Sequence, residues 1–176
     1  MTDLGPVTLR VTEVEAYLGD GTDPGSHAYR GRNNKNSAMF GEPFTLYTYL
    51  SYGIHTCVNI VCSPAGQASA ILIRAGEIVV GSDIARARRG ETVPDRDLAR
   101  GPGRLGQALG IRLADGGASL AGPVFTLELP AAPARASTSP RTGVSGPGGE
   151  AEFPWRFFIA GDRSVSPYRK SAARPR

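Results

Sequence analysis

The sequence predicts an α+β protein in which helices flank a curved, mostly antiparallel sheet. Short β-prone runs separated by tight turns dominate the first half of the chain, and strands that follow one another so closely pair most simply in antiparallel fashion. Helical patterns are fewer, shorter and bounded by glycine. With 176 residues and 40% hydrophobic content, the chain fits a single domain over residues 1–176 with its own core.

The first predicted strand covers residues 7–18 and contains a predicted bulge. Its apolar residues occupy odd positions up to Val11 and even positions from Val14 onward, so the alternation slips at Thr12-Glu13. Bulges often re-aim side chains beside functional sites. The following residues 20–36 are rich in Gly, Asp, Asn and Arg and predict a long polar loop, a length that usually indicates function or disorder.

The remaining elements follow in chain order. Val, Ile, Tyr and Thr dominate the predicted strands, and Gly90 and Gly110 end the predicted helices. The predicted strands are residues 45–50, 55–61, 68–74, 124–129 and 157–160, and the predicted helices are residues 78–89 and 105–109.

Low-complexity composition marks two further segments. Residues 130–149 are rich in Pro, Ala, Ser and Gly, which predicts a mobile loop. Residues 163–176 form a basic tail that we expect to be disordered and to add only non-specific attraction to DNA.

The charge balance favours an anionic partner. Twenty Lys and Arg residues face 16 Asp and Glu, which gives a formal charge of +4, and Lys35 and Lys170 are the only lysines. Arginine binds phosphate with two parallel hydrogen bonds and stacks on bases. A compositional bias of the genome, which also enriches Gly, Ala and Pro, explains the arginine content equally well.

Neither a membrane anchor nor a cofactor is predicted. No apolar run approaches the roughly 20 residues of a membrane span, and the N-terminus lacks the apolar core of a signal peptide. We therefore expect a cytoplasmic protein in which Cys57 and Cys62 are free thiols. The spacing of cysteines and histidines does not match a structural zinc site, so no metal is expected.

A carboxylate and a tyrosine ring share one face of the first strand. Glu13, Glu15 and Tyr17 alternate along it and project to the same side. Such a carboxylate can activate water, and the ring offers a flat stacking surface. The alternative is an ordinary solvated strand surface, with Glu13 as a structural partner.

A second aromatic cluster follows. Tyr47 and Tyr49 alternate on one strand face, which fits either a stacking site for a flat base or cross-strand packing within the sheet. Tyr52 differs because it precedes Gly53 at a turn, where a ring cannot easily join the core. Projecting turn residues such as Tyr52 and Ile54 resemble the wedges that proteins insert between base steps.

Polar residues accompany both clusters, each with an alternative structural role. Asn59 either makes a structural hydrogen bond or reads the edge of a base. His27 is either a surface residue or part of a site in the polar loop.

Basic residues also admit two interpretations. Arg30, Arg32 and Lys35 suit phosphate contacts as well as any solvated loop. Arg74 ends an apolar strand and either forms an ion pair or reaches an anion.

Together these motifs resemble the alkyladenine (3-methyladenine) DNA glycosylases of the mammalian type. The resemblance runs from about Val11 to Ile111, resumes at Arg141 and again at Trp155, and is far more specific than any single motif. It rests on EVEAYLG, the His27 loop, LYTYLSYGIHTCVN, ILIRA and GPGRLGQALGI, in this order.

The resemblance implies a monofunctional base-excision repair enzyme without metal or cofactor. Such an enzyme flips a damaged purine out of duplex DNA and hydrolyses its N-glycosidic bond; 3-methyladenine is the implied substrate, with hypoxanthine and ethenoadenine as further candidates. By motif position Glu15 is the general base that deprotonates water. Tyr17, His27 and Tyr49 are the implied walls of the base pocket, and Asn59 discriminates against the exocyclic amine of guanine.

The resemblance also implies how DNA is held. Tyr52 fills the gap left by the flipped nucleotide, Arg74 lies near the catalytic water and the target phosphate, and Arg32 with Lys35 belongs to a loop that grips the DNA backbone. The implied partner is double-stranded DNA that contains damaged purines. We expect a monomer associated with the nucleoid.

Two features depart from the family pattern. Family members usually begin with a further helix and strand, whereas this chain enters the EVEAYLG strand soon after Met1, and Asn33-Asn34-Lys35 replaces a more usual Thr-Pro-Arg. The first departure leaves a second hypothesis, a lesion-binding DNA module without turnover.

Overall fold

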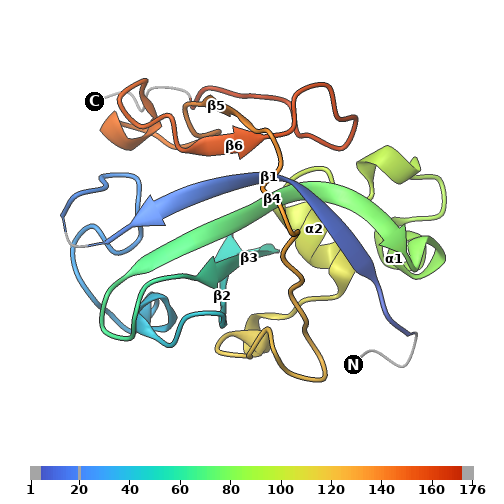
Figure 1. Ribbon diagram of the computed structural model, residues 1–176, viewed down its shortest axis with the longest axis horizontal. Coiled ribbons are helices and arrows are strands. Elements are labelled where there is room, and N and C mark those ends of the chain that lie inside the picture. Colours follow the sequence, from blue (N-terminus) through green and yellow to red (C-terminus); the bar gives the residue numbers. More distant parts are fainter. Residues whose placement is uncertain (1–4, 20, 172–176) are drawn as a thin grey trace.

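A computed structural model describes residues 5–19 and 21–171 as a six-stranded antiparallel sheet with α-helices beside it (Figure 1). The elements are β1 (Thr8–Leu18), β2 (Leu46–Ser51), β3 (His55–Val61), β4 (Ser69–Val80), α1 (Ser82–Arg89), α2 (Pro102–Leu109), β5 (Ser137–Ser139) and β6 (Arg156–Phe158). The strand order is β2-β3-β4-β1-β6-β5, which places the long strands β4 and β1 at the centre. The predicted α+β class is confirmed.

The predicted bulge in β1 is confirmed. The register against β4 shifts between Val11 and Glu13 and again between Glu13 and Val14. Because of this shift, Leu9 from an odd position and Val14 from an even position both pack against the same core. Glu13 is buried as well, at 1% exposure.

β4 is longer than predicted and shortens the helix that follows. Its last residues pair with the start of β1, up to the partners Thr8 and Val80. The hydrogen-bonded pairing of β4 with β1 therefore overrides the helical pattern that begins at residue 78. Gly81 has φ 75°, a left-handed conformation that ends the strand, and α1 begins at Ser82.

The second helix begins earlier than predicted. α2 starts at Pro102, where the fixed φ of proline suits the first helical turn, and ends at Gly110 as expected. Its Gly106 approaches β3 so closely that a Cβ would lie 2.1 Å from the carbonyl oxygen of Thr56. Only glycine allows this contact. Within the described ranges, no helix combines the length and apolar character needed to cross a membrane.

The strand predicted at residues 124–129 is wrong. The described chain there makes only an isolated bridge between Ala121 and Thr126, and Phe125 and Leu127 pack against the core from an irregular segment. Conversely, residues 130–149 were predicted as a loop but contain β5, which pairs with β6 from Ser137 to Ser139. β6 itself lies slightly earlier than the predicted residues 157–160.

Part of the predicted disordered tail is packed. Ser164 and Ser166 are buried, at 3% and 7% exposure. Their segment lies against β1, because Thr12 and Ser164 share a hydrogen bond of 2.8 Å. Residues 172–176 of the predicted tail lie outside the described residues.

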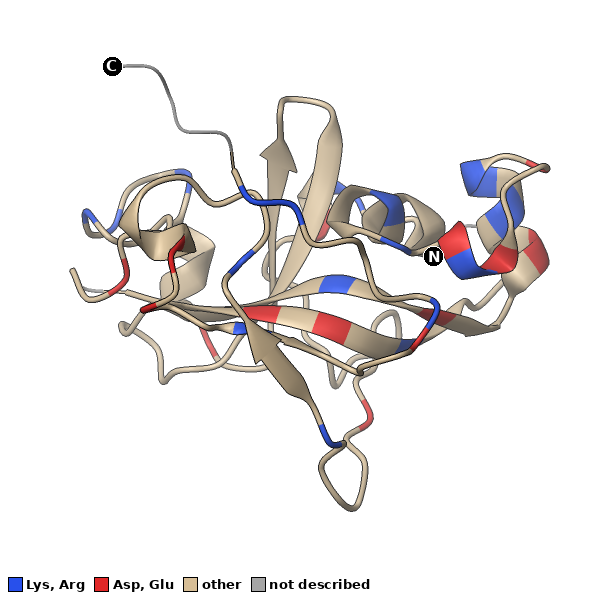
Figure 2. Cartoon of the chain, turned by 90° about the horizontal axis from the view of Figure 1, so that it is seen from above, with Lys and Arg blue, Asp and Glu red and all other residues tan. Residues whose placement is uncertain are grey.

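The two faces of the sheet have different partners. One face packs with α1 and α2 in an apolar core that includes Leu46, Val58, Ile73, Leu98 and Leu105. The other face carries polar and aromatic side chains. Acidic positions lie beside basic positions on the strands in the middle of the molecule (Figure 2).

Candidate active site

The strand register places three of the residues singled out in the sequence, Tyr47, Asn59 and Glu15, in one row across the sheet. Tyr47 is paired with Asn59, Asn59 with Leu72, Leu72 with Glu15, and Glu15 with Arg156. Residues directly opposite each other in antiparallel strands project to the same face. Elements far apart in the sequence thus bring these side chains together, on the face away from the helices.

Glu15 is a fully buried carboxylate with three donors around it. Its exposure is 0%. The Tyr17 hydroxyl donates to Oε2 at 2.7 Å, Arg74 Nη1 donates to the same oxygen at 3.2 Å, and the Thr142 N–H donates to Oε1 at 2.7 Å. The alternative of a solvated strand surface is therefore wrong, and Glu15 is a fixed, oriented acceptor.

Glu13 has a structural environment. Arg74 Nε and Arg156 Nε donate to its Oε1 at 2.8 and 2.7 Å, and the Ser166 N–H donates to Oε2 at 2.6 Å. Burial alone would raise the pKa of Glu13, but the hydrogen bond from Arg156 and the charge of Arg74 outweigh it, so the pKa is lowered. Arg74 thus forms the predicted ion pair and joins both carboxylates.

Tyr17 remains a hydrogen-bond donor. Burial and the adjacent charge of Glu15 hold its pKa well above the ordinary value, so the phenol keeps its proton. The guanidinium carbon of Arg141 lies 4.2 Å from the centre of its ring. One face of Tyr17 is therefore occupied by a cation.

A group of neutral rings lies beside the carboxylates. The ring centres of His27 and Tyr49 are 4.7 Å apart, those of Tyr47 and Tyr49 are 5.8 Å apart, and His27 Nδ1 is 2.9 Å from the Tyr47 hydroxyl. Partial burial lowers the pKa of His27 and raises that of Tyr47 to about 12. Burial likewise raises the pKa of Tyr49, with further contributions from the neighbouring Cys57 and, to a smaller extent, from the charge of Glu15. The rings therefore form an uncharged surface.

The two interpretations of the tyrosine cluster apply to different residues. Tyr47 is 3% exposed and packs with Met39 and Phe40, so it is a cross-strand core residue. Tyr49 is only partly buried, and His27 keeps a large part of its surface exposed although its ring contacts Tyr49. Asn59 is 3% exposed, and its amide donates to the Tyr47 carbonyl at 3.0 Å, as the structural alternative predicts.

The turn between β2 and β3 presents apolar side chains to solvent. Tyr52 is 91% exposed and Ile54 73% exposed. Tyr52 has φ 52°, in the left-handed region that non-glycine residues rarely adopt. The turn therefore holds a large ring outward at some conformational cost.

The polar loop is organised around one asparagine. The buried Asn36 donates its amide hydrogens to the carbonyls of His27 and Gly31 at 2.9 and 3.0 Å. The predicted DNA contacts of this loop, Arg30, Arg32 and Lys35, are all exposed. These three side chains are thus accessible to a partner, whereas both carboxylates are buried.

Several site residues were not predicted. Arg141 is fully buried and donates to both carboxylate oxygens of Asp23, at 2.9 and 2.5 Å, while its neighbour Thr142 holds Glu15. Arg156 holds Glu13 from the other side. The family resemblance includes both positions, in the runs Arg141-Thr142-Gly143-Val144 and Trp155-Arg156-Phe157-Phe158, but by itself it gives neither run a role.

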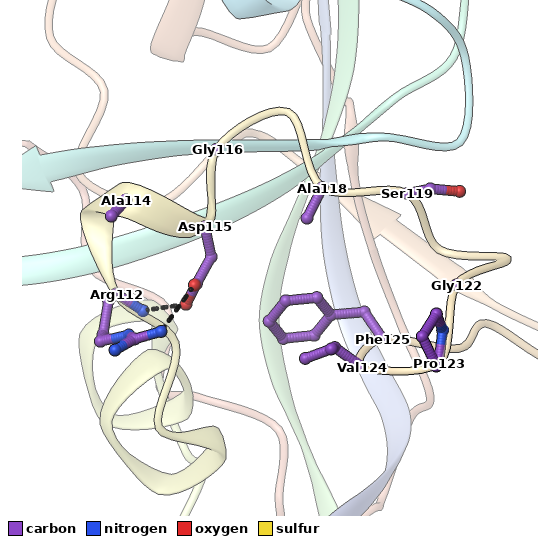
Figure 3. Close-up of a pocket in the computed structure, with 10 residues that line it drawn as sticks. All are labelled: Arg112, Ala114, Asp115, Gly116, Ala118, Ser119, Gly122, Pro123, Val124 and Phe125. Carbon is purple, nitrogen blue, oxygen red and sulfur yellow. Dashed lines mark hydrogen bonds and ion pairs between the residues drawn. The ribbon is translucent and has the colours of Figure 1, made fainter. Parts of the chain in front are cut away.

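A hollow separate from these residues lies in the segment that follows α2. It has a volume of about 480 Å³ and is lined by ten residues of the segment between Arg112 and Phe125. Figure 3 shows the paired side chains of Arg112 and Asp115 on one side of it and the ring of Phe125 on another. None of the predicted site residues lines this hollow.

Comparison with known proteins matches this sequence to one family. The profile of methylpurine-DNA glycosylase (MPG) matches residues 1–163. A protein of Leifsonia xyli is 58% identical over 96% of this chain and 81% of its own length. Relatives from Streptomyces avermitilis and Nocardia farcinica are 51% and 48% identical, over 98% and 97% of this chain and 82% and 83% of their lengths.

All three relatives are named "Putative 3-methyladenine DNA glycosylase". The match extends over nearly the whole described sheet and includes both buried carboxylates. The chain therefore belongs to the methylpurine-DNA glycosylase family and is a DNA glycosylase, a hydrolase whose substrate is DNA.

Proposed function

We propose that this protein flips an alkylated or otherwise damaged purine out of duplex DNA and hydrolyses its N-glycosidic bond with a water activated by Glu15. The observation that carries the proposal is the burial and threefold hydrogen bonding of Glu15 beside neutral rings. Cleavage of a glycosidic bond builds positive charge on the sugar. A fixed carboxylate stabilises that charge and accepts the proton of the attacking water.

The rings suit a flat, electron-poor base. Tyr17, His27 and Tyr49 are neutral at physiological pH by the pKa shifts above, so they stack without attracting a counter-ion. Alkylation places positive charge on the purine, which makes the base a good leaving group and favours stacking on tyrosine. We propose 3-methyladenine as the main substrate, and we propose that Asn59, held by its structural hydrogen bond to the Tyr47 carbonyl, also rejects the exocyclic amine of guanine.

The exposed residues suit the DNA itself. Tyr52 and Ile54 occupy the gap left by the flipped nucleotide, and Arg30, Arg32 and Lys35 contact the backbone phosphates. Lys35 lies in this loop, and Lys170 pairs with Glu150 at 3.0 Å. Neither lysine approaches Glu15 in sequence, so we propose hydrolysis without a Schiff-base lyase step. The proposed enzyme acts as a monomer on nucleoid DNA in the cytoplasm.

The experiment that tests this function measures base release from alkylated duplex DNA. We expect free 3-methyladenine and an abasic site that is cleaved by alkali but not by the protein alone. Free alkylated nucleosides are the control substrate and should react far more slowly. Lesion-selective binding without base release would instead support a DNA-binding module.

Tyr52→Ala should slow excision from duplex DNA by roughly 5- to 150-fold, because base–aromatic stacking contributes about 1–3 kcal/mol. The thermal midpoint should not change, since the ring is 91% exposed. Single-turnover excision and duplex binding measure the effect. Leu129→Ala is the matched control, because Leu129 is also an exposed apolar residue, at 71%, and lies outside the β2–β3 turn. Equal rates for the two variants would argue against the proposed role of Tyr52.

A further inference from the structure

The two oxygens of Glu15 are engaged unequally. Oε2 accepts hydrogen bonds from Tyr17 and Arg74, whereas Oε1 accepts one from the Thr142 N–H among the described residues. Each carboxylate oxygen offers about two lone-pair sites. Oε1 therefore keeps an acceptor site, and it does so next to Thr142.

Thr142 itself carries an unpaired hydroxyl. Its Oγ1 is buried and has no hydrogen-bond partner in the described part of the chain. Only the N–Cα, Cα–Cβ and Cβ–Oγ1 bonds separate this oxygen from the amide nitrogen that holds Glu15. A buried hydroxyl without a partner is costly, and native structures usually satisfy such a group with a water molecule or ligand.

We propose that the Thr142 hydroxyl binds the water that Glu15 deprotonates. This inference rests on the proposed function and adds a water-binding group to it. The water donates one hydrogen to Glu15 Oε1 and the other to Thr142 Oγ1, which leaves an oxygen lone pair directed at the anomeric carbon of the sugar.

The reaction then balances with groups already named. The water oxygen forms a bond to the anomeric carbon, and the C–N bond to the purine breaks with its electron pair going to the base. The water proton shared with Glu15 passes to Oε1. Thr142 keeps its own proton throughout and fixes only the direction of attack.

The segment that carries Thr142 is held independently of this hydroxyl. Arg141 donates to the Ala16 and Gly148 carbonyls, each at 2.9 Å, and pairs with Asp23. Thr142→Val therefore removes the hydroxyl, leaves the amide that holds Glu15 in place, and keeps nearly the same side-chain shape.

The test measures single-turnover release of 3-methyladenine from alkylated duplex DNA together with the thermal midpoint. Thr142→Val should react roughly 10- to 100-fold more slowly, as expected for the loss of a hydrogen bond to a reacting group. Its thermal midpoint should equal or exceed that of the wild type, because no described protein group loses a hydrogen-bond partner when the hydroxyl is removed. Thr142→Ser should restore most of the rate.

Ser69→Ala is the matched control. Ser69 Oγ is also buried without a partner among the described residues, but Ser69 lies on β4 opposite Leu18, beyond the Glu15 row. We expect this variant to excise at the wild-type rate. A purely local packing effect of losing a buried hydroxyl would slow both variants alike and would overturn the inference.

The remaining outcomes separate this inference from the proposed function. A Thr142→Val enzyme with the wild-type rate would overturn the role of the hydroxyl while leaving the proposed function intact. A slow Thr142→Val enzyme with a lowered thermal midpoint and no rescue by serine would also overturn it. The absence of base release from the wild type would refute the proposed function itself.

Discussion

Arg141→Met is expected to lower the free energy of unfolding by about 3–5 kcal/mol, the usual cost of removing one partner of a buried ion pair. Arg141 and Asp23 both have side chains with 0% exposure, and the guanidinium donates to both oxygens of the aspartate. Methionine fills much of the volume but leaves Asp23 as a buried charge without its cation. The Ala16 and Gly148 carbonyls also lose their donor.

Thermal unfolding measures this prediction. For a domain of this size the loss corresponds to a decrease of about 6–20 °C in the midpoint. Arg10→Met is the matched control, because Arg10 pairs with Glu77 and Asp162 at the surface, with a side chain 49% exposed. Exposed pairs contribute about 0–1 kcal/mol. Equal midpoints for the two variants would show that the buried pair contributes no more than a surface pair.

The sequence was sufficient for those parts of the fold that depend on local patterns. The phase slip at Thr12-Glu13 predicted the bulge, and the run from His55 to Val61 predicted β3 with its bounds. The exposed position of Tyr52 also followed from its place before Gly53. In each case neighbouring residues carry the determining signal.

Local patterns failed where long-range pairing decides the structure. Residues 78–80 were predicted as the start of a helix, but their pairing with β1 makes them the end of β4. β5 forms within the segment predicted as a loop because β6 provides a partner for Ser137 and its neighbours. Contacts between distant strands cannot be read from either segment separately.

The sequence predicted part of the candidate site but not the residues that hold it in place. Glu15, Tyr17 and Arg74 were identified by residue type and position, and they do meet. Glu13 was expected as a structural partner, but Arg156 and Arg141 were missed, because they lie 143 positions from Glu13 and 118 positions from Asp23. The choice of partner for a buried charge depends on the tertiary structure.

Glu15→Gln is expected to reduce excision by about 10³-fold or more, since a general base contributes roughly 10²–10⁴-fold and the lost charge also stabilised the sugar cation. Glutamine has the same size, and its carbonyl oxygen can still accept from Tyr17 or Thr142. Arg74 keeps its ion pair with Glu13. We therefore expect the variant to fold and to bind lesion-containing duplex DNA nearly as tightly as the wild type.

Glu77→Gln is the matched control for this change. Glu77 lies on β4, is 54% exposed at its side chain, and pairs with Arg10 away from the Glu15 row. Glu77→Gln also removes one negative charge, but this change should leave the excision rate unchanged. Comparison of the two variants separates the chemistry of Glu15 from a general effect of net charge on DNA binding.

The most direct test of the central claim is the single-turnover rate of 3-methyladenine release by Glu15→Gln with all of the alkylated duplex DNA bound. If the buried carboxylate activates water, this rate falls about 10³-fold or more while duplex affinity and thermal midpoint stay close to those of Glu77→Gln. Release by the Glu15→Gln variant at a rate close to that of the wild type would contradict the claim, because another group would then have to supply the base.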